Sequence, residues 1–282
     1  MNIRRFEPPR FRNDDGFSVV IVLAVMTAIF TLALCGARTA AGRREIAAMH
    51  ADRVAVHHAN HSGLALAVAI IQSDTTAWDG PGDTWYPAAT VPIGDLIASI
   101  TVEDEQARLP VHYLLRPSGD LNEPVVSAFR NVFPTCIIDR DRWANDRNRW
   151  EQTHHDLPIS ALAAIRLLGI TDPDADRFVT VYGTGRININ TADPKMLEAL
   201  GGSAFSRAVV RARSRQALTS VFDLSESVII PPGVVSILDT RSSCFRITIS
   251  TPGRFVIGRL EAVVWRQGSN ILVLDQKEWW TG

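Results

Sequence analysis

The feature of this sequence that most constrains its fold is a run of 21 consecutive uncharged residues near the N-terminus, Phe17 to Ala37. At 1.5 Å per residue, a helix of this length reaches roughly 30 Å, enough to cross the hydrocarbon core of a bilayer. About 245 residues of mixed, soluble-looking sequence follow it. What the protein does therefore depends on what this apolar block is.

Three interpretations of the apolar block compete. A secretory signal peptide has a shorter apolar region, about 7–15 residues, that ends at a small-residue cleavage site. A lipoprotein anchor at Cys35 would follow Leu34, which is bulky where such sites prefer a small residue. The third interpretation is a retained membrane helix, with a leader removed between Gly16 and Phe17, and the length of the block favours it. Arginines flank the block on both sides, so the positive-inside rule only weakly favours a cytoplasmic leader.

Composition limits the remaining possibilities. The chain has 282 residues, a formal net charge of −1 and 46% apolar residues, which fits one large or two small domains outside the membrane. A nearly neutral chain has no electrostatic footprint for nucleic acid. Of the three cysteines, Cys35 lies in the apolar block, so Cys136 and Cys244 are the only pair that can form a disulfide in an oxidising compartment. Two buried, unpaired thiols are the open alternative, because sequence does not give their separation.

The pattern of apolar residues predicts an α+β fold. A helical pattern continues from the apolar block, so residues 17–73 are expected to form one helix, half in lipid and half packed on a globular domain. Residues 74–95 are rich in Gly, Pro and Asp and are expected to form a loop. Alternating residues predict a hairpin, with strands at 96–103 and 109–113 and a polar turn between them.

The rest of the chain is expected to contain helices and then strands. Residues 119–240 carry helical patterns, and three strands in a meander follow, at 245–250, 255–266 and 271–275. The two groups of strands can share one antiparallel sheet only if the helical section is an insertion. The expected domains are therefore a leader (1–16), a transmembrane helix (17–73), a sheet domain (74–118 with 241–282) and an inserted helical domain (119–240).

Residues that could carry out chemistry are few. A nucleophilic triad, a phosphate-binding loop and paired Cys motifs are absent from the sequence, which favours a non-enzymatic role. His57 and His61 have the i, i+4 spacing that can hold a metal, but no nearby acidic residue completes a set, so we interpret them as part of a solvated helix face. Asp172, Asp174 and Asp176 resemble the start of a calcium loop without its glycine and glutamate. We therefore assign no metal site and no cofactor, and no specific motif supports calcium.

Three stretches together resemble one known family. Gly16-Phe17 at the start of the apolar block is similar to a type IV prepilin processing site. The segment GRININTA (185–192), followed by KMLEAL (195–200), resembles the G-x-I-N-I-N-T-A segment of type II secretion system protein K, the large minor pseudopilin. The closing strands, with Leu260-Glu261-Ala262-Val263, are similar to that family's R-x-E-A-V strand and the short strand after it. The resemblance spans nearly the whole chain, and the INTA segment is its most specific part.

The resemblance implies both a fold and a role. The implied fold is that of a pseudopilin, with a long helix on a small antiparallel sheet and an inserted SAM-like helical domain. The implied processing is a cut by the prepilin peptidase after Gly16 and methylation of the new N-terminal Phe17. The implied protein crosses the inner membrane once, with its C-terminal domain in the periplasm. Its implied partners are two other minor pseudopilins and the major pseudopilin, in a filament whose tip it starts or caps for protein export across the outer membrane.

Ile21 gives one further indication. Most pilins carry Glu at this position, five residues after the cut, where it meets the N-terminal amine of a neighbour. A charge at mid-bilayer costs about 2.5–3.5 kcal/mol on insertion scales, so it is retained when a partner uses it. Members of the protein K family typically lack the Glu, which suits a tip subunit with no neighbour above it. An ordinary single-pass anchor would also lack it.

One competing hypothesis belongs to a different class. The INTA segment with its two helices also resembles the helix-hairpin-helix DNA-binding module of competence proteins, which would make the chain a membrane-anchored DNA receptor. Here the turn reads Gly201-Gly202-Ser203 in place of the usual Gly-Ile-Gly. Arg207, Arg211, Arg213 and Arg215 are basic, but the whole chain is nearly neutral. We therefore expect no nucleic-acid partner.

Overall fold

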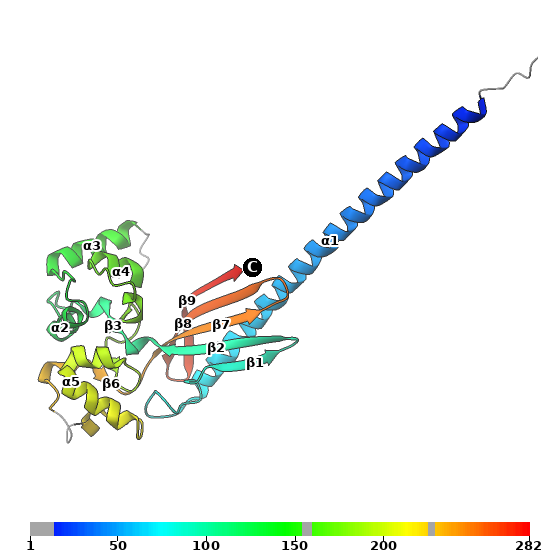
Figure 1. The fold of residues 1–282 in the computed structure, drawn as a ribbon. Helices are drawn as coiled ribbons and strands as arrows, with labels where there is room; N and C mark the ends of the chain where they lie inside the picture. The colour runs from blue at the N-terminus through cyan, green and yellow to red at the C-terminus, as the bar shows by residue number, and fades with distance from the viewer. Residues whose placement is uncertain (1–13, 154–159, 225–228) are drawn as a thin grey trace, which may run out of the picture. The chain divides into compact units, whose positions relative to one another are not determined.

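The long N-terminal helix is the first element of the fold. The computed structural model describes residues 14–153, 160–224 and 229–282. Helix α1 (Asp14–Ser73) is one uninterrupted helix of 60 residues, as the sequence predicted for 17–73 (Figure 1). The chain divides into two compact units, Met1–Val54 and Ala55–Gly282, so the boundary between them falls within α1. Each unit is described by itself below.

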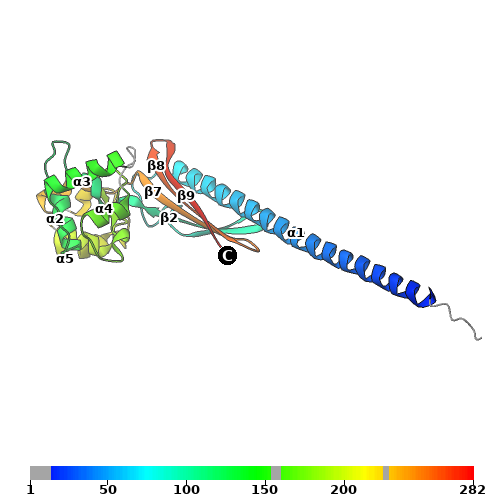
Figure 2. The ribbon, with the colours of Figure 1, turned by 90° about the horizontal axis from the view of Figure 1, so that it is seen from above.

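A five-stranded antiparallel sheet forms one half of the second unit. Its strands lie in the order β1-β2-β7-β8-β9. Strand β2 pairs with β7, although some 140 residues separate them in the chain, and Figures 1 and 2 show the two side by side. The meander β7–β8–β9 and its place in one sheet with the earlier strands are confirmed. The bounds of the strands are Ala89–Ile93 (β1), Leu96–Asp104 (β2), Cys244–Pro252 (β7), Ile257–Gln267 (β8) and Asn270–Thr281 (β9).

The predicted hairpin over 96–113 is wrong, as is the assignment of all of 74–95 to a loop. Strand β2 forms its hairpin with β1, through a tight turn at Gly94 with φ of +60°, so the partner strand precedes β2. The later segment supplies only β3 (Leu109–Pro110), which pairs in parallel with β4 (Val179–Thr180) and continues as a 3-10 turn. Pro110 has no amide proton to donate to a ladder, which is one reason why that strand is short.

The C-terminal part of α1 packs on one face of the sheet. Leu64, Ala67 and Ile71 of α1 form a buried cluster with Trp85 and with apolar residues of β2, β7 and β8. The alternating burial along β7 explains how an i, i+2 pattern presents one apolar face to the helix. The sheet residues of the cluster are Ala98, Ile100, Val102, Phe245, Ile247, Ile249, Leu260, Ala262 and Val264.

Gly258 in β8 allows a close approach between this part of α1 and the sheet. A Cβ atom at Gly258 would lie 2.5 Å from Cγ1 of Val56 and 2.8 Å from Nδ2 of Asn60. Both distances are shorter than real Cβ contacts, so no other residue fits without movement of the helix. The glycine therefore brings Val56 and Asn60 close to strands β8 and β9.

Between β2 and β7 the chain forms a mainly helical section with a core of its own. That core contains Phe129, Phe205 and Met196 among its fully buried side chains. The section also holds two short parallel strand pairs, β3–β4 and β5–β6. The sequence had suggested an all-helical section, and these strand pairs correct that prediction. Its remaining elements are α2 (Glu123–Val132), α3 (Arg140–Thr153), α4 (Ala161–Leu167), β5 (Ile187–Asn188), α5 (Pro194–Arg213), α6 (Pro232–Val235) and β6 (Leu238–Asp239).

Helix α5 follows the INTA segment directly. The carboxylate of Asp193 accepts a hydrogen bond from the backbone N–H of Lys195 at 2.8 Å and caps the helix N-terminus. The helix breaks at Gly202, whose φ of +81° suits glycine, and this divides it into the two helical segments that the sequence predicted.

Candidate functional site

The apolar block lies in the first unit as a fully exposed stretch of α1. All described side chains from Phe17 to Ala37 are exposed, and α1 is the one helix among the described residues that is long and apolar enough to cross a membrane. The hydroxyls of Thr27 and Thr31 each donate to the carbonyl oxygen four residues earlier, at 2.7 Å. These polar groups are thus satisfied inside the helix, as lipid requires. The block has the properties of a single membrane anchor.

The predicted processing site lies at the start of this helix. Gly16 and Phe17 fall in the first turn of α1, which begins at Asp14, and most of the predicted leader lies outside the described residues. Ile21 follows one turn later and is 47% exposed. The cut and the methylation remain predictions.

Asn188 of the INTA segment joins the helical section to the sheet. Its side-chain amide donates to the carbonyl oxygen of Asp79 at 2.9 Å, to Oδ2 of Asp104 at 2.9 Å and to Oγ of Ser242 at 3.0 Å. Asp104 is the last residue of β2, and Ser242 lies just before β7. One buried amide therefore fixes the two points at which the helical section leaves the sheet and returns to it.

Asp104 is the buried acceptor at the centre of this junction. It also accepts from the hydroxyls of Thr191 and Ser242, at 2.5 Å each, and from the backbone N–H of Gln106. Burial raises the pKa of Asp104, and these donors partly offset the rise. The second asparagine of the motif, Asn190, exchanges hydrogen bonds with the backbone of Leu218. The polar side chains of the INTA motif thus form hydrogen bonds at the junction and within the helical section.

Arg266 supplies the positive charge on the sheet side of the junction. Its guanidinium donates to the carboxylate of Asp79, to the carbonyl oxygen of Ser242 at 2.7 Å and to Asp74 at 3.2 Å, and it lies over the ring of Phe245. Burial raises the pKa of Asp79 to about 6, although Ser242 and Arg266 act against the rise. The loop after α1 is in this way tied to β8.

Asp74, Asp79 and Asp83 form an acidic cluster that the sequence analysis did not identify. One carboxylate oxygen of each lies within 4.8 Å of the others. Arg266 pairs with two of the three, and Asp83 accepts from the backbone N–H of Gly80 at 2.8 Å. These contacts describe an anchored loop. In the acidic stretch at Asp172, Asp174 and Asp176, Asp174 directly precedes a 3-10 turn (Ala175–Arg177) that contains Asp176.

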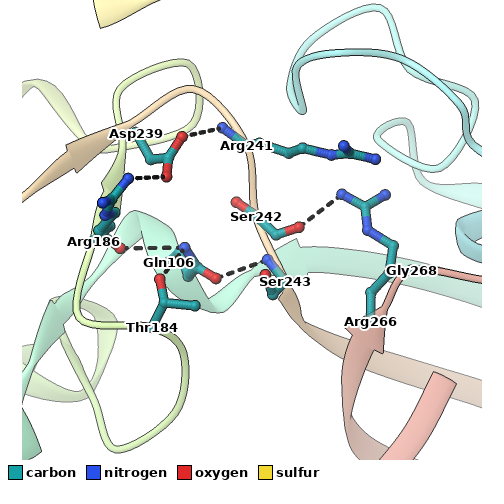
Figure 3. A pocket seen from close by; sticks show the side chains of 9 residues that line it. All are labelled: Gln106, Thr184, Arg186, Asp239, Arg241, Ser242, Ser243, Arg266 and Gly268. Carbon is teal, nitrogen blue, oxygen red and sulfur yellow. Dashed lines mark hydrogen bonds and ion pairs between the residues drawn. The ribbon is translucent and has the colours of Figure 1, made fainter. Parts of the chain in front are cut away.

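A polar pocket of about 400 Å³ opens beside the junction (Figure 3). Gln106 crosses it, since its side chain accepts from the N–H of Ser243 at 2.7 Å and donates to Thr184 and to the carbonyl oxygen of Arg186. Asp239, the one carboxylate in its wall, pairs with Arg186 at 3.3 Å. The lining contains no histidine or cysteine. The lining is Gln106, Thr184, Arg186, Asp239, Arg241, Ser242, Ser243, Arg266 and Gly268.

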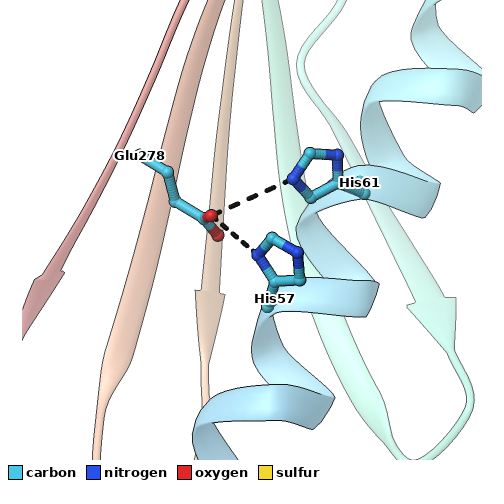
Figure 4. A group of neighbouring side chains, drawn as sticks. All are labelled: His57, His61 and Glu278. Carbon is cyan, nitrogen blue, oxygen red and sulfur yellow. Dashed lines mark hydrogen bonds and ion pairs between the residues drawn. The ribbon is translucent and has the colours of Figure 1, made fainter.

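His57 and His61 are only partly solvated, because both lie beside a carboxylate that the sequence analysis did not identify. Nδ1 of His57 lies 2.7 Å from Oε2 of Glu278 in β9, and Nε2 of His61 lies 3.9 Å from the same oxygen (Figure 4). Asn60 donates to Oε1 of Glu278 at 3.2 Å. Sequence reasoning missed Glu278 because 221 residues separate it from His57, and no local pattern connects them.

The two cysteines of the predicted pair are free thiols in the structure. Cys136 is half-buried against the core of the helical section, whereas Cys244 is fully buried at the start of β7. Burial raises the pKa of both thiols. The structure therefore contains the unpaired alternative, and Cys244 has the surroundings of an inert core thiol.

We compared the chain with known protein families, curated proteins and solved structures. No protein-family model matches the sequence, and no curated protein matches it. Among solved structures, the chain is similar to one described as the crystal structure of the GspK-GspI-GspJ complex from the enterotoxigenic Escherichia coli Type 2 Secretion System. The TM-score is 0.57 at 15% sequence identity, and the match covers 80% of this chain and 96% of that one. The chain has a pseudopilin fold.

The fold predicted from the resemblance to protein K is confirmed by this match. The DNA-receptor alternative rested only on the INTA segment and the two helices that follow it, whereas the pseudopilin match covers 80% of the chain. Arg213, one of the four arginines that could have bound phosphate, donates to the carbonyl oxygens of Ile189, Asn190 and Ala192 at 2.7–3.2 Å. Its guanidinium is therefore used within the INTA segment.

Proposed function

We propose that this chain is a minor pseudopilin at the tip of a type II secretion pseudopilus, where it starts or caps the filament for export across the outer membrane. The observation that carries the proposal is the likeness of its fold to a chain of the GspK-GspI-GspJ complex over most of both chains. In this role Phe17 to Ala37 anchors the chain in the inner membrane, and the second unit lies in the periplasm. Its partners are two other minor pseudopilins, the major pseudopilin and the prepilin peptidase.

Two features of the chain support a place at the tip. Ile21 stands where most pilins carry Glu, so the chain has no side chain to engage the N-terminal amine of a neighbour above it. The helical section between β2 and β7 adds bulk that would crowd the sides of a filament but not its end. An ordinary subunit of the filament shaft needs the Glu and a slimmer body.

Co-purification tests the proposal. The full chain, carrying an affinity tag at its C-terminus, is expressed with the two other minor pseudopilins of the same secretion system and isolated in detergent. We expect a stoichiometric three-component complex, and we expect the major pseudopilin alone to replace neither partner. Recovery of the chain without both partners, under conditions in which those two bind each other, would contradict the tip assignment.

A further inference from the structure

The cluster of His57, His61 and Glu278 has a geometry that the assembly role does not use. The two histidines lie one turn apart on α1, and their ring centroids are 4.4 Å apart with the ring planes tilted by 55°. One ring nitrogen of each and one carboxylate oxygen of Glu278 all lie within 4.8 Å of one another. Three residues from two separate elements therefore direct ligand atoms toward one point (Figure 4).

The surroundings hold Glu278 in the orientation that such a site needs. Asn60, fully buried between the helix and the sheet, donates its amide to Oε1 and leaves Oε2 directed toward both histidines. Gly258 permits this contact, because a side chain there would collide with the Asn60 amide. An oriented carboxylate with a buried hydrogen-bond donor behind it is the usual support of a metal ligand.

We propose that His57, His61 and Glu278 bind a divalent transition-metal ion, Zn²⁺, which fastens the edge strand β9 to α1. Two imidazole nitrogens and one carboxylate oxygen are a common zinc ligand set, whereas Ca²⁺ and Mg²⁺ prefer oxygen ligands throughout. Ligand atoms in a tetrahedral zinc site lie about 3.3 Å apart, given bond lengths of about 2.0–2.2 Å. The contacts of 2.7 and 3.9 Å to Oε2 fall on either side of that value.

An ion can reach the cluster from solvent, and the histidine side chains can rotate to bind it. The side chains of His57 and His61 are 45% and 40% exposed, so small rotations can bring each nitrogen to bonding distance and water can supply a fourth ligand. Without the ion, the same groups form a hydrogen bond between His57 and Glu278. The ion would bind the folded chain and not the unfolded one, so it would stabilise the attachment of β9.

Zinc binding by the full chain tests the proposal directly. The chain is purified in detergent without a histidine tag, stripped with a chelator and titrated with ZnCl₂ in a calorimeter, with elemental analysis of the dialysed product. We expect one zinc per chain, and we expect His61→Ala and Glu278→Gln each to weaken binding at least tenfold. His58→Ala is the matched control, because His58 lies on the same helix, is exposed and is not part of the cluster.

A second readout separates ligation from structural damage. Zinc should raise the thermal unfolding midpoint of the wild-type chain and of His58→Ala, and leave that of His61→Ala and Glu278→Gln unchanged. Circular dichroism without zinc checks that each variant is folded. The proposal is overturned if the wild type retains no zinc, if both cluster variants bind as tightly as the wild type, or if His58→Ala loses as much affinity as they do.

Discussion

Asn188 shows at the scale of one residue why the INTA segment tolerates few alternatives. Its amide reaches a carbonyl oxygen, a carboxylate and a hydroxyl that belong to three separate segments, and all of them are buried. Aspartate would place a second negative charge against Asp104, and leucine would remove the one side-chain donor that these three acceptors share. The sequence alone marked the motif by its resemblance, but it could not assign this role, because the partners are distant along the chain.

Replacing Asn188 with Ala should lower the free energy of unfolding by about 2–4 kcal/mol, since three buried acceptors lose a donor at once. Chemical denaturation of the full chain in detergent, followed by tryptophan fluorescence, measures the change. Asn131→Ala is the control, because the exposed Asn131 donates one hydrogen bond, to the carbonyl oxygen of Ala199, and its loss should cost about 1 kcal/mol or less. Equal losses in the two variants would show that Asn188 is not a special contact.

Asp79 makes a prediction about pH. Its pKa in the folded chain is raised to about 6 from an ordinary value near 3.8, so between these values the folded state holds a proton that the unfolded state has released. Its contribution to stability is therefore fully present below pH 4 and lost as pH rises past 6, by at most about 3 kcal/mol. The unfolding free energy of the wild type relative to Asp79→Asn should fall over this range. Asp95→Asn, in the exposed β1–β2 turn, controls for loss of a carboxylate.

Whole helices and strands were predicted correctly where the pattern of apolar residues was long and uninterrupted. The 60-residue helix and the three strands of the meander are such cases, because many residues repeat one period. Strand β1 was missed because it has only five residues, contains Pro92 and lies at the sheet edge, where a proline is tolerated. The sequence predicted that the two groups of strands share one sheet around an insertion, but it did not predict that β2 pairs with the distant β7.

The approach of α1 to the sheet depends on Gly258, and a single methyl group tests it. In Gly258→Ala the new Cβ would lie 2.5 Å from Val56 and 2.9 Å from the ring of Trp280, so the helix or strand must move. We expect a loss of about 1–3 kcal/mol in the free energy of unfolding. Gly42→Ala is the control, since a Cβ there meets nothing within 4 Å, and alanine favours a helix by up to about 1 kcal/mol. A neutral Gly258→Ala would mean that the contact between helix and sheet is loose.

At the scale of the whole molecule, the chain shares its fold with a solved pseudopilin structure at only 15% sequence identity, so few residues can be essential to that fold. Two of the three stretches that carry the resemblance lie in the second unit. Asn188, Asn190 and Thr191 hold the junction, and Leu260 and Ala262 of β8 belong to the core under α1. Both places require particular shapes and hydrogen-bond donors.

In the proposed role, a cut between Gly16 and Phe17 would convert this chain into its assembling form, and both residues lie in the first turn of α1. The first N–H groups of a helix have no partner within it, so the backbone around Gly16 and Phe17 opens at little cost to a peptidase. In cells with the prepilin peptidase, intact mass should show a chain that begins at Phe17 and carries one extra methyl group. Gly16→Leu should keep its full length, and Gly36→Ala, inside the apolar block, should be cut as the wild type is. A wild-type chain that still begins at Met1 would remove processing from the proposed role.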